Sequence, residues 1–377
     1  MSGTIAEMQN PLAEDIPGAT GFLTIDLGAL GRNYAKLAAL AAPATTAAVV
    51  KADAYGLGAV QVAKTLASKG CRNFFVAQFG EALKLKPVLP SDARLFVLNG
   101  LQPGAEERCA SDGIIPVINS VEQWDRWDET ARILNRRLPA AVQFDTGMSR
   151  LGVAFDHRAD MESLIKASQH VDVLFVMSHL ACADEPENEQ NDDQLSEMLK
   201  VAEAFPGVPH CLANSGGVFL GKPYHGALVR PGIALYGGSP VGTSANPMEP
   251  VVRLDIAVVQ TRTVPAGTKV GYGGSQVTDK ETRLATIAAG YADGLSRALS
   301  SRGAVYFNGV RLPIVGRVSM DSMTVDISAL PEGTLTLGSR VEVLGPNQTL
   351  EDVARDAGTI SYEILTSLGH RYQRRYV

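Results

Sequence analysis

The chain has 377 residues, of which 45% are hydrophobic, and is long enough to bury one or two cores. This composition excludes an intrinsically disordered chain. The 34 basic and 40 acidic residues leave a formal net charge of -6, which offers no cationic surface for nucleic acid. No stretch approaches the roughly 20 uninterrupted apolar residues that a bilayer span requires. We therefore expect a soluble protein that binds neither nucleic acid nor a membrane.

The N-terminal segment and the cysteines indicate a cytoplasmic protein. The first 20 residues contain Glu7, Glu14 and Asp15 but no Lys or Arg, which predicts a mobile tail rather than a signal peptide. The 4 cysteines include no C-x-x-C pair and are too few for a disulfide framework in a chain of this size, so reduced thiols are expected. The 6 histidines show no metal-binding spacing, and we expect no metal site.

From about Thr45 to Gly237, short apolar runs alternate with amphipathic segments of helical spacing. Eight strands are expected, at Ala47–Lys51, Phe74–Ala77, Arg94–Leu98, Ile114–Ile118, Ala140–Phe144, Val171–Ser178, His210–Asn214 and Ala227–Arg230. Helices are expected at Ala59–Ser68, Val121–Leu134, Arg158–Ser168 and Asp192–Ala204, with Ser120 capping the second. Strands buried on both faces and followed by helices predict a (β/α)8 barrel of the TIM type.

After Gly237-Gly238-Ser239-Pro240 the pattern becomes mainly β. Strands are expected at Leu254–Val264, Arg283–Ala289, Ala304–Phe307, Arg311–Val318, Thr324–Ile327 and Arg340–Leu344, and helices at Leu350–Ala357 and Ser361–Leu368. Asn308-Gly309 predicts a tight hairpin turn. We therefore divide the chain into a tail (1–20), a barrel (21–240) and a mainly β domain (241–377). The sequence leaves open whether the first strand, near 21–27, packs with the C-terminal domain.

Two polar residues stand out at the ends of expected barrel strands, where the active sites of such barrels lie. Lys51 ends the first strand before a glycine-rich turn. A desolvated lysine there can form a Schiff base, although a lysine that simply extends to solvent is the commoner case. Arg150 follows the Asp145-Thr146-Gly147 turn and suits an anionic oxygen, but it is equally compatible with a surface turn.

Two further strand ends carry a histidine and a loop suited to binding phosphate. His179 is a lone histidine, and such residues are usually structural. Ser215, which precedes two glycines, and Gly232, which follows Arg230, offer a hydroxyl and backbone N–H groups suited to a phosphate. None of these segments is specific by itself.

Taken together and in this order, the motifs resemble those of the alanine racemases, pyridoxal-phosphate enzymes built from a barrel and a β domain. The barrel motifs are Val50-Lys51-Ala52-Asp53-Ala54-Tyr55-Gly56, Asp145–Gly152, Ser178-His179-Leu180 and Val229–Gly237. The C-terminal part adds Val270-Gly271-Tyr272-Gly273, Gly290–Gly294, Gly316–Asp321 and Ser361-Tyr362-Glu363. The resemblance spans nearly the whole chain.

The resemblance implies pyridoxal phosphate as the cofactor, held by Lys51 as an internal aldimine. The residues expected to surround it are Tyr55, Arg150, His179, Asn214, Ser215, Arg230, Gly232, Ile233 and Tyr362. Of these, Tyr55, Ser215, Gly232, Ile233 and Tyr362 would contact the phosphate. Arg230 would face the pyridine nitrogen, where a permanently charged guanidinium can only donate and keeps that nitrogen unprotonated.

The resemblance also implies two acid–base groups on opposite faces of the substrate. Lys51 would act on D-alanine and Tyr272 on L-alanine, with the tyrosine supplied by the partner subunit of a homodimer that shares its active sites. A free tyrosine has a pKa of about 10, so Tyr272 needs cationic or hydrogen-bonding neighbours, which His179 and Arg230 would supply.

Substrate recognition would use Arg150 and the N–H group of Met320 on the carboxylate, with Asp321 near Lys51. Tyr291 and Tyr362 resemble the two phenols that narrow the family's access channel, which favours a small side chain. At Gln143 many family members carry a carbamylated lysine that holds the equivalent of Arg150. The glutamine amide can accept only a weaker, neutral hydrogen bond there.

We therefore expect an alanine racemase that interconverts L- and D-alanine, either for peptidoglycan synthesis or in alanine catabolism. A decarboxylase of basic amino acids is disfavoured because Arg230 stands where that group places an acid. A broader serine and alanine racemase uses the same chemistry and stays open. A non-catalytic pyridoxal-phosphate carrier is disfavoured by the β domain and Tyr272.

Overall fold

The computed structural model describes residues 16–242 and 245–377, so the expected N-terminal tail is described only from Ile16 onward. The chain forms two compact units. The first, here called the barrel unit, spans Leu27–Val251, and the second, the β unit, comprises residues 16–26 together with Val252–Val377. The barrel unit therefore extends past the boundary expected near residue 240.

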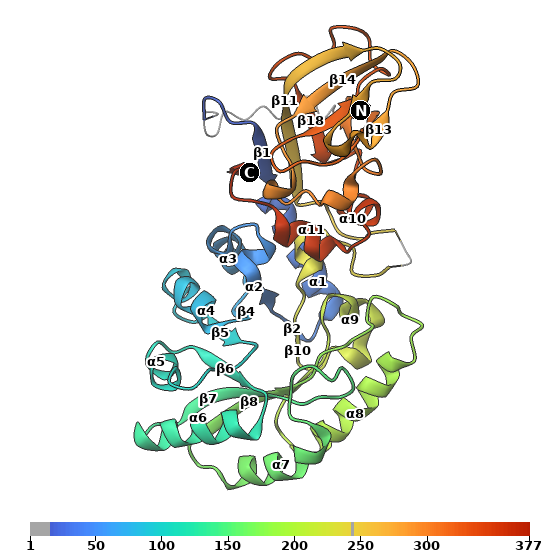
Figure 1. Ribbon diagram of the computed structural model, residues 1–377. Coiled ribbons are helices and arrows are strands. Elements are labelled where there is room, and N and C mark those ends of the chain that lie inside the picture. The colour runs from blue at the N-terminus through green and yellow to red at the C-terminus, as the bar shows by residue number, and fades with distance from the viewer. Residues whose placement is uncertain (1–15, 243–244) are drawn as a thin grey trace, which may run out of the picture. The chain divides into compact units, whose positions relative to one another are not determined.

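The barrel unit contains parallel strands arranged in chain order (Figure 1). They are β3 (Ala48–Val49), β4 (Asn73–Val76), β5 (Arg94–Val97), β6 (Ile115–Ile118), β7 (Leu138–Gln143), β8 (Val171–Met177) and β9 (His210–Cys211). The strand β10 (Leu228–Val229) pairs in parallel with β2 (Thr45–Thr46), which precedes β3. Backbone hydrogen bonds from Ala227 to His210 and from Ala47 to Val229, both 2.9 Å, connect β10 to β9 on one side and to β2 on the other. The ring closes in this way, which confirms the expected barrel.

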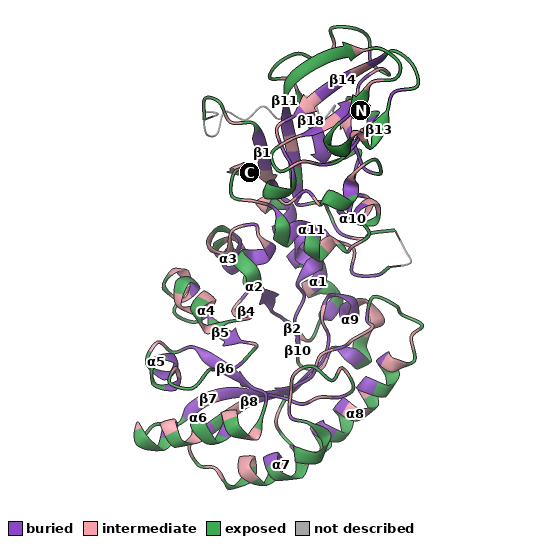
Figure 2. Ribbon diagram, viewed as in Figure 1, coloured by how far each residue is buried: buried purple, intermediate pink, exposed green. Residues whose placement is uncertain are grey.

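Helices alternate with these strands. They are α1 (Leu27–Ala41), α3 (Ala59–Ser68), α4 (Phe79–Leu85), α5 (Glu106–Ser111), α6 (Val121–Ile133), α7 (Arg158–Ala167), α8 (Gln190–Ala204) and α9 (Ser215–Leu220). The Ser120 hydroxyl caps α6 by accepting the Gln123 N–H, and α6 buries Trp124 and Trp127. Figure 2 shows the barrel strands buried and the helices exposed along one side, as expected of a barrel whose strands are covered by helices.

The β unit is built on one mixed sheet. Its main path runs β16 (Val310–Pro313), β15 (Ala304–Phe307), β18 (Arg340–Leu344), β11 (Val252–Val264), β1 (Gly21–Ile25) and β19 (Gln373–Tyr376), while β14 (Thr282–Ile287) pairs with β11 and β17 (Met323–Asp326). A separate hairpin joins β12 (Lys269–Val270) to β13 (Gln276–Val277), and the helices α10 (Leu350–Ala357) and α11 (Ser361–Ser367) follow β18. The first strand, β1, thus pairs with β11 and β19 of this unit.

The turn between β15 and β16 has the predicted geometry, but β16 is shorter than predicted. Asn308 and Gly309 have φ values of 48° and 82°, which confirms the tight hairpin. The strand expected over Arg311–Val318 ends at Pro313. Ile314 makes only an isolated bridge, and Gly316 has a φ of 76°, which turns the backbone out of the extended conformation.

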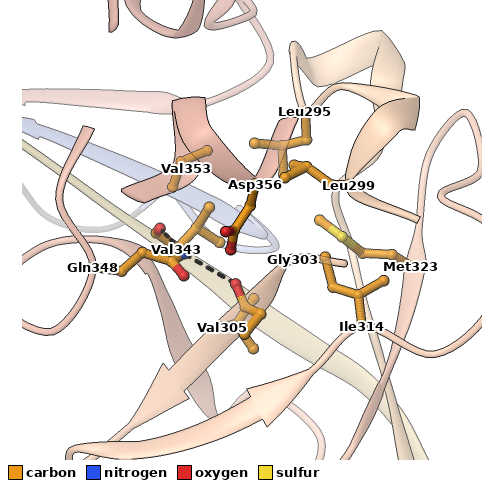
Figure 3. A pocket seen from close by; sticks show the side chains of 11 residues that line it. Leu295, Leu299, Gly303, Val305, Ile314, Met323, Val343, Gln348, Val353 and Asp356 are labelled. Atoms are coloured by element: carbon orange, nitrogen blue, oxygen red, sulfur yellow. Dashed lines mark hydrogen bonds between the residues drawn. The ribbon is translucent and has the colours of Figure 1, made fainter. Parts of the chain in front are cut away.

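The interior of the β unit contains one buried amide beside a small cavity of about 10 Å³ (Figure 3). Gln348 is 4% exposed, and its Nε2 group donates to the carbonyl oxygens of Val343 at 2.7 Å and Ala304 at 2.9 Å. Most of the other lining side chains are apolar, among them Leu295, Leu299, Ile314, Met323 and Val353, and Asp356 also lines the cavity. The amide satisfies two carbonyls where the sheet meets α10.

Within residues 16–242 and 245–377, every helix is too short or too polar to cross a membrane. In the same residues, no three His, Cys, Asp or Glu side chains come together as metal ligands would.

Candidate active site

Lys51 lies just beyond the carboxyl end of β3, at the start of an unusual turn. The four residues from Ala52 to Tyr55 have positive φ values between 52° and 56°, and Gly56 completes the turn at 82°. The backbone N–H of Gly56 donates to the carbonyl of Ala52 at 2.7 Å. This left-handed turn separates Lys51 from Tyr55, the two cofactor residues predicted in this segment.

Arg230, just after β10, is 2% exposed and has hydrogen-bond partners on each side of its guanidinium. Its Nε donates to Sγ of Cys211 at 3.0 Å, and its Nη2 donates to the carbonyls of Ser178 and Leu212. Nη1 lies 3.3 Å from Nδ1 of His179. In the described part of the chain, no carboxylate pairs with Arg230, so carbonyl, thiol and imidazole acceptors hold its charge in place.

The cations of this site act on Lys51. Burial lowers the pKa of Lys51, and the positive charges of Arg150 and Arg230 lower it further, while Glu81 raises it. A lysine with a lowered pKa has more of the neutral amine that attacks carbonyl carbon. The strand ends after β3, β7, β8 and β10 therefore bring Lys51, Arg150, His179 and Arg230 close enough to influence one another electrostatically.

A second group of predicted residues forms a cradle of hydroxyls and backbone N–H groups. The Ser215 hydroxyl accepts hydrogen bonds from the N–H of Gly232 at 2.8 Å and of Ala234 at 3.3 Å. A Cβ on Gly232 would lie 2.2 Å from the Tyr55 hydroxyl oxygen, so only glycine allows this approach. Asn214 caps the following helix by accepting the Gly217 N–H at 3.0 Å. Such a cradle suits a phosphate, and a lysine with a lowered pKa suits an aldehyde, so these residues fit pyridoxal phosphate.

The surroundings of Gln143 differ from the expectation that its amide accepts a hydrogen bond from Arg150. Gln143 is 6% exposed, whereas Arg150 is exposed. No hydrogen bond joins their side chains in the part of the chain that the structure describes. Instead, Asp145 shapes the loop before Arg150, because its Oδ1 accepts the N–H groups of Gly147, Met148 and Ser149 at 2.9 to 3.1 Å.

Ile233 lies in the barrel unit and is buried, whereas the other remaining predicted residues lie in the β unit and are exposed there. The exposed fractions are 71% for Tyr272, 44% for Tyr291, 53% for Met320 and 42% for Tyr362. Backbone hydrogen bonds of 3.0 Å from Tyr291 to Ser319 and from Ala292 to Met320 bind two of the predicted motifs together.

Asp321 is held by a residue that the sequence reasoning missed. Arg371 donates to Asp321 Oδ1 at 2.6 Å and makes a two-pronged ion pair with Asp293 at 2.6 and 2.8 Å. Asp293 is 3% exposed and also accepts the Gly290 N–H at 3.0 Å. Arg371 thus fixes the Tyr291 and Met320 loops to each other. Asp293 belongs to the predicted Gly290–Gly294 motif, but its burial and its pairing with Arg371 are visible in the structure and not in the sequence.

Two family models match the chain: the N-terminal domain of alanine racemase over residues 25–240 and the C-terminal domain over residues 251–376. The chain belongs to the alanine racemase family. The catabolic alanine racemase of Rhizobium johnstonii is 67% identical over 95% of both chains. That of Agrobacterium fabrum is 61% identical over 98% of this chain and 96% of its own.

Solved alanine racemase structures share the fold. The enzyme of Bartonella henselae, with covalently bound pyridoxal phosphate, has a TM-score of 0.92 and 45% identity over 95% of this chain and 100% of its own. The biosynthetic enzyme of Pseudomonas aeruginosa has a TM-score of 0.88 and 32% identity over 95% of this chain and 99% of its own. Membership in this family agrees with the resemblance drawn from the motifs.

Proposed function

We propose that this chain interconverts L-alanine and D-alanine with pyridoxal phosphate as its cofactor. The observation that carries the proposal is Lys51, whose pKa is lowered by burial, Arg150 and Arg230, next to a cradle formed by Tyr55, Ser215 and Gly232. Membership in the alanine racemase family supports the same reaction. When bound, the cofactor supplies the electron sink that makes the α-proton of alanine acidic.

The barrel unit would hold the cofactor. Lys51 Nζ would bind its aldehyde carbon, and the hydroxyls of Tyr55 and Ser215, with the N–H groups of Gly232 and Ile233, would bind its phosphate. Asn214 would stabilise the loop that carries Ser215, and Tyr362 would add a third hydroxyl from the β unit. Arg230 would donate to the pyridine nitrogen, with His179 beside it.

Racemisation needs one group to remove a proton and another to deliver one on the opposite face. We assign these roles to Lys51 Nζ for D-alanine and to the Tyr272 hydroxyl for L-alanine. Arg150 and the Met320 N–H would hold the substrate carboxylate, while Tyr291 and Tyr362 limit the size of the side chain. Asp321, held by Arg371, would shape the same part of the substrate pocket.

We further propose a homodimer in which the Tyr272 of one subunit completes the site of its partner. A side chain that is 71% exposed in the isolated chain is a poor acid–base group until a second surface desolvates it, which supports this arrangement. The four free cysteines support a reducing, cytoplasmic location. The names of the relatives from Rhizobium johnstonii and Agrobacterium fabrum support a role in alanine catabolism.

The test is to incubate the purified protein with L-alanine and pyridoxal phosphate in heavy water, and to follow chirality and α-deuterium together. Deuterated alanine of both hands is the expected result. Exchange without inversion would contradict the two-base assignment, and absence of exchange would contradict the racemase proposal. L-serine in a parallel reaction separates an alanine racemase from a broader enzyme.

A further inference from the structure

The segment after Lys51 is a left-handed turn made of residues other than glycine. The residues from Ala52 to Tyr55 all have φ values between 52° and 56°. L-residues adopt this region at a cost in free energy, and a run of four is rare, so the turn persists only where its surroundings hold it. Because Lys51 precedes this turn directly, whatever holds the turn also sets the position of the lysine.

The carboxylate of Glu81 makes the contact that holds the start of this turn. Its Oε1 accepts the backbone N–H of Ala52 at 2.5 Å. Its Oε2 accepts the N–H groups of Ala77 at 2.8 Å and Gln78 at 2.9 Å, just beyond the end of β4. One ionised group therefore connects the ends of two neighbouring barrel strands through charge-assisted hydrogen bonds.

Helix capping accounts for only part of this arrangement. Glu81 is the third residue of α4, and its bond to Gln78 completes an ordinary capping box. The bond to Ala52 leaves the helix and reaches the residue next to Lys51. By contrast, Asp352 at the same position of α10 accepts hydrogen bonds from the N–H and hydroxyl of its capping residue, Thr349, and pairs with Arg355 within its own helix.

We propose that Glu81 is a positioning residue of the racemase, which holds the left-handed turn so that Lys51 Nζ reaches the cofactor aldehyde and the substrate α-carbon. This inference rests on the role given to Lys51 in the proposed function. It assigns no contact between Glu81 and substrate or cofactor.

The charge of Glu81 adds a second, separable effect. Burial lowers the pKa of Lys51, as do Arg150 and Arg230, and His179 lies within electrostatic reach of all three. Glu81 acts in the opposite direction, since a nearby negative charge favours the protonated amine. Removing this charge should lower the pKa of Lys51 further, whereas shortening the side chain should disturb its position and keep the charge.

The experiment measures how fast apoprotein captures pyridoxal phosphate at Lys51 as a function of pH. In this step the neutral Nζ amine condenses with the aldehyde carbon and releases one water. Borohydride reduction followed by mass spectrometry reports the modified lysine. The variants are Glu81→Gln and Glu81→Asp, with Asp352→Asn as the matched capping control, and the melting temperature of each apoprotein is recorded.

For Glu81→Gln we expect the rate at the high-pH plateau to fall by about 10- to 100-fold, as expected for a reacting group displaced by about 1 Å, and the midpoint to move to lower pH. Glu81→Asp should lower the plateau without moving the midpoint. Asp352→Asn should leave the plateau rate and the midpoint unchanged, although it weakens a helix cap of the same kind.

An unchanged plateau and midpoint in Glu81→Gln would overturn the proposal. A rate loss shared by Asp352→Asn would do the same, because it would reduce Glu81 to a helix cap. If Glu81→Gln does not fold, the plateau of Glu81→Asp decides. Wild-type protein that captures the cofactor at Lys51 but leaves alanine unchanged would refute the proposed function alone, since the capture rates still test Glu81.

Discussion

The Nη1 group of Arg230 lies 3.3 Å from Nδ1 of His179. A guanidinium can only donate, so Nδ1 accepts this hydrogen bond and the neutral imidazole carries its proton on Nε2. Burial and the positive charges of Arg230, Arg150 and Lys51 lower the pKa of His179 well below 6.5. His179 therefore contributes a hydrogen bond to the site and adds no second cation beside Arg230.

This relationship predicts a dependence of stability on pH. The unfolded chain protonates His179 near pH 6.5, whereas the folded chain does not. The contribution of His179 to the free energy of unfolding is therefore fully present above pH 6.5 and declines as the pH falls below it. The free energy of unfolding should then fall by up to about 1.4 kcal/mol for each pH unit. Denaturant unfolding of wild type and His179→Asn between about pH 8 and pH 5 measures it.

The comparison isolates one group. His210, whose pKa is also lowered by burial, is present in both proteins, so its effect cancels in the difference. We expect the stability of wild type to fall more steeply than that of His179→Asn. Parallel curves would show that His179 titrates normally in the folded protein.

Substitution of the two proposed bases, Lys51 and Tyr272, should have different effects on cofactor binding and on turnover. Lys51→Ala should lose the visible absorbance of the covalently bound cofactor, since it removes the only amine assigned to the aldehyde. Tyr272→Phe should keep this absorbance and lose turnover of L-alanine by about 100-fold or more, the usual contribution of a positioned acid–base group. Absorbance spectra and initial rates from each enantiomer check both. Unchanged turnover in Tyr272→Phe would remove the tyrosine from the mechanism.

The substitution at Gln143 gives a third prediction. The structure shows no hydrogen bond between the side chains of Gln143 and Arg150, so the position of the arginine does not depend on a neutral amide contact. Instead, Asp145 organises the preceding loop. We therefore expect Gln143→Lys to remain active, with a change in the KM for alanine of less than about 10-fold. A folded but inactive variant would show that the pocket requires a neutral side chain here.

The barrel was predictable because two signals in the sequence indicate the same fold over a long segment. Apolar runs alternate with amphipathic segments, and polar residues follow the expected strands. The helix α3 was predicted with its observed bounds, and Ser120 was identified as a cap, because local signals decide both. The helix α1 (Leu27–Ala41) was not predicted, although Leu30, Tyr34 and Leu37 have helical spacing and are buried. Its two glycines, Gly28 and Gly31, weaken the helical signal in the sequence.

The site residues that could be predicted from the sequence are reactive or charged side chains that stand within a recognisable motif. Glu81 and Arg371 were missed because their partners lie far along the chain: Glu81 binds Ala52, and Arg371 binds Asp293. Such contacts depend on the tertiary arrangement, and an isolated Glu or Arg is usually solvated. The left-handed turn was also unpredictable, because Ala and Tyr ordinarily avoid positive φ.

The buried amide in the β unit gives a prediction about stability. Gln348→Leu keeps the approximate size of the side chain but leaves the carbonyls of Val343 and Ala304 without their side-chain donor. Each loss should cost about 1–3 kcal/mol of unfolding free energy. Denaturant unfolding checks this, with exposed Gln276→Leu as a control expected to change stability by less than about 0.5 kcal/mol. Equal effects in the two variants would contradict the structural role of Gln348.

A shared active site predicts that two inactive variants restore each other. In a heterodimer of Lys51→Ala and Tyr272→Phe chains, one site would combine the intact Lys51 of one subunit with the intact Tyr272 of its partner, and the other site would lack both. Random mixing makes about half of the dimers mixed, each with one of two sites restored, so the mixture should recover about one quarter of wild-type activity. If each chain built its site alone, every site in the mixture would lack one base and activity would stay at the level of the single variants. Rates measured after unfolding and refolding the variants together, compared with refolding them separately, decide between these arrangements.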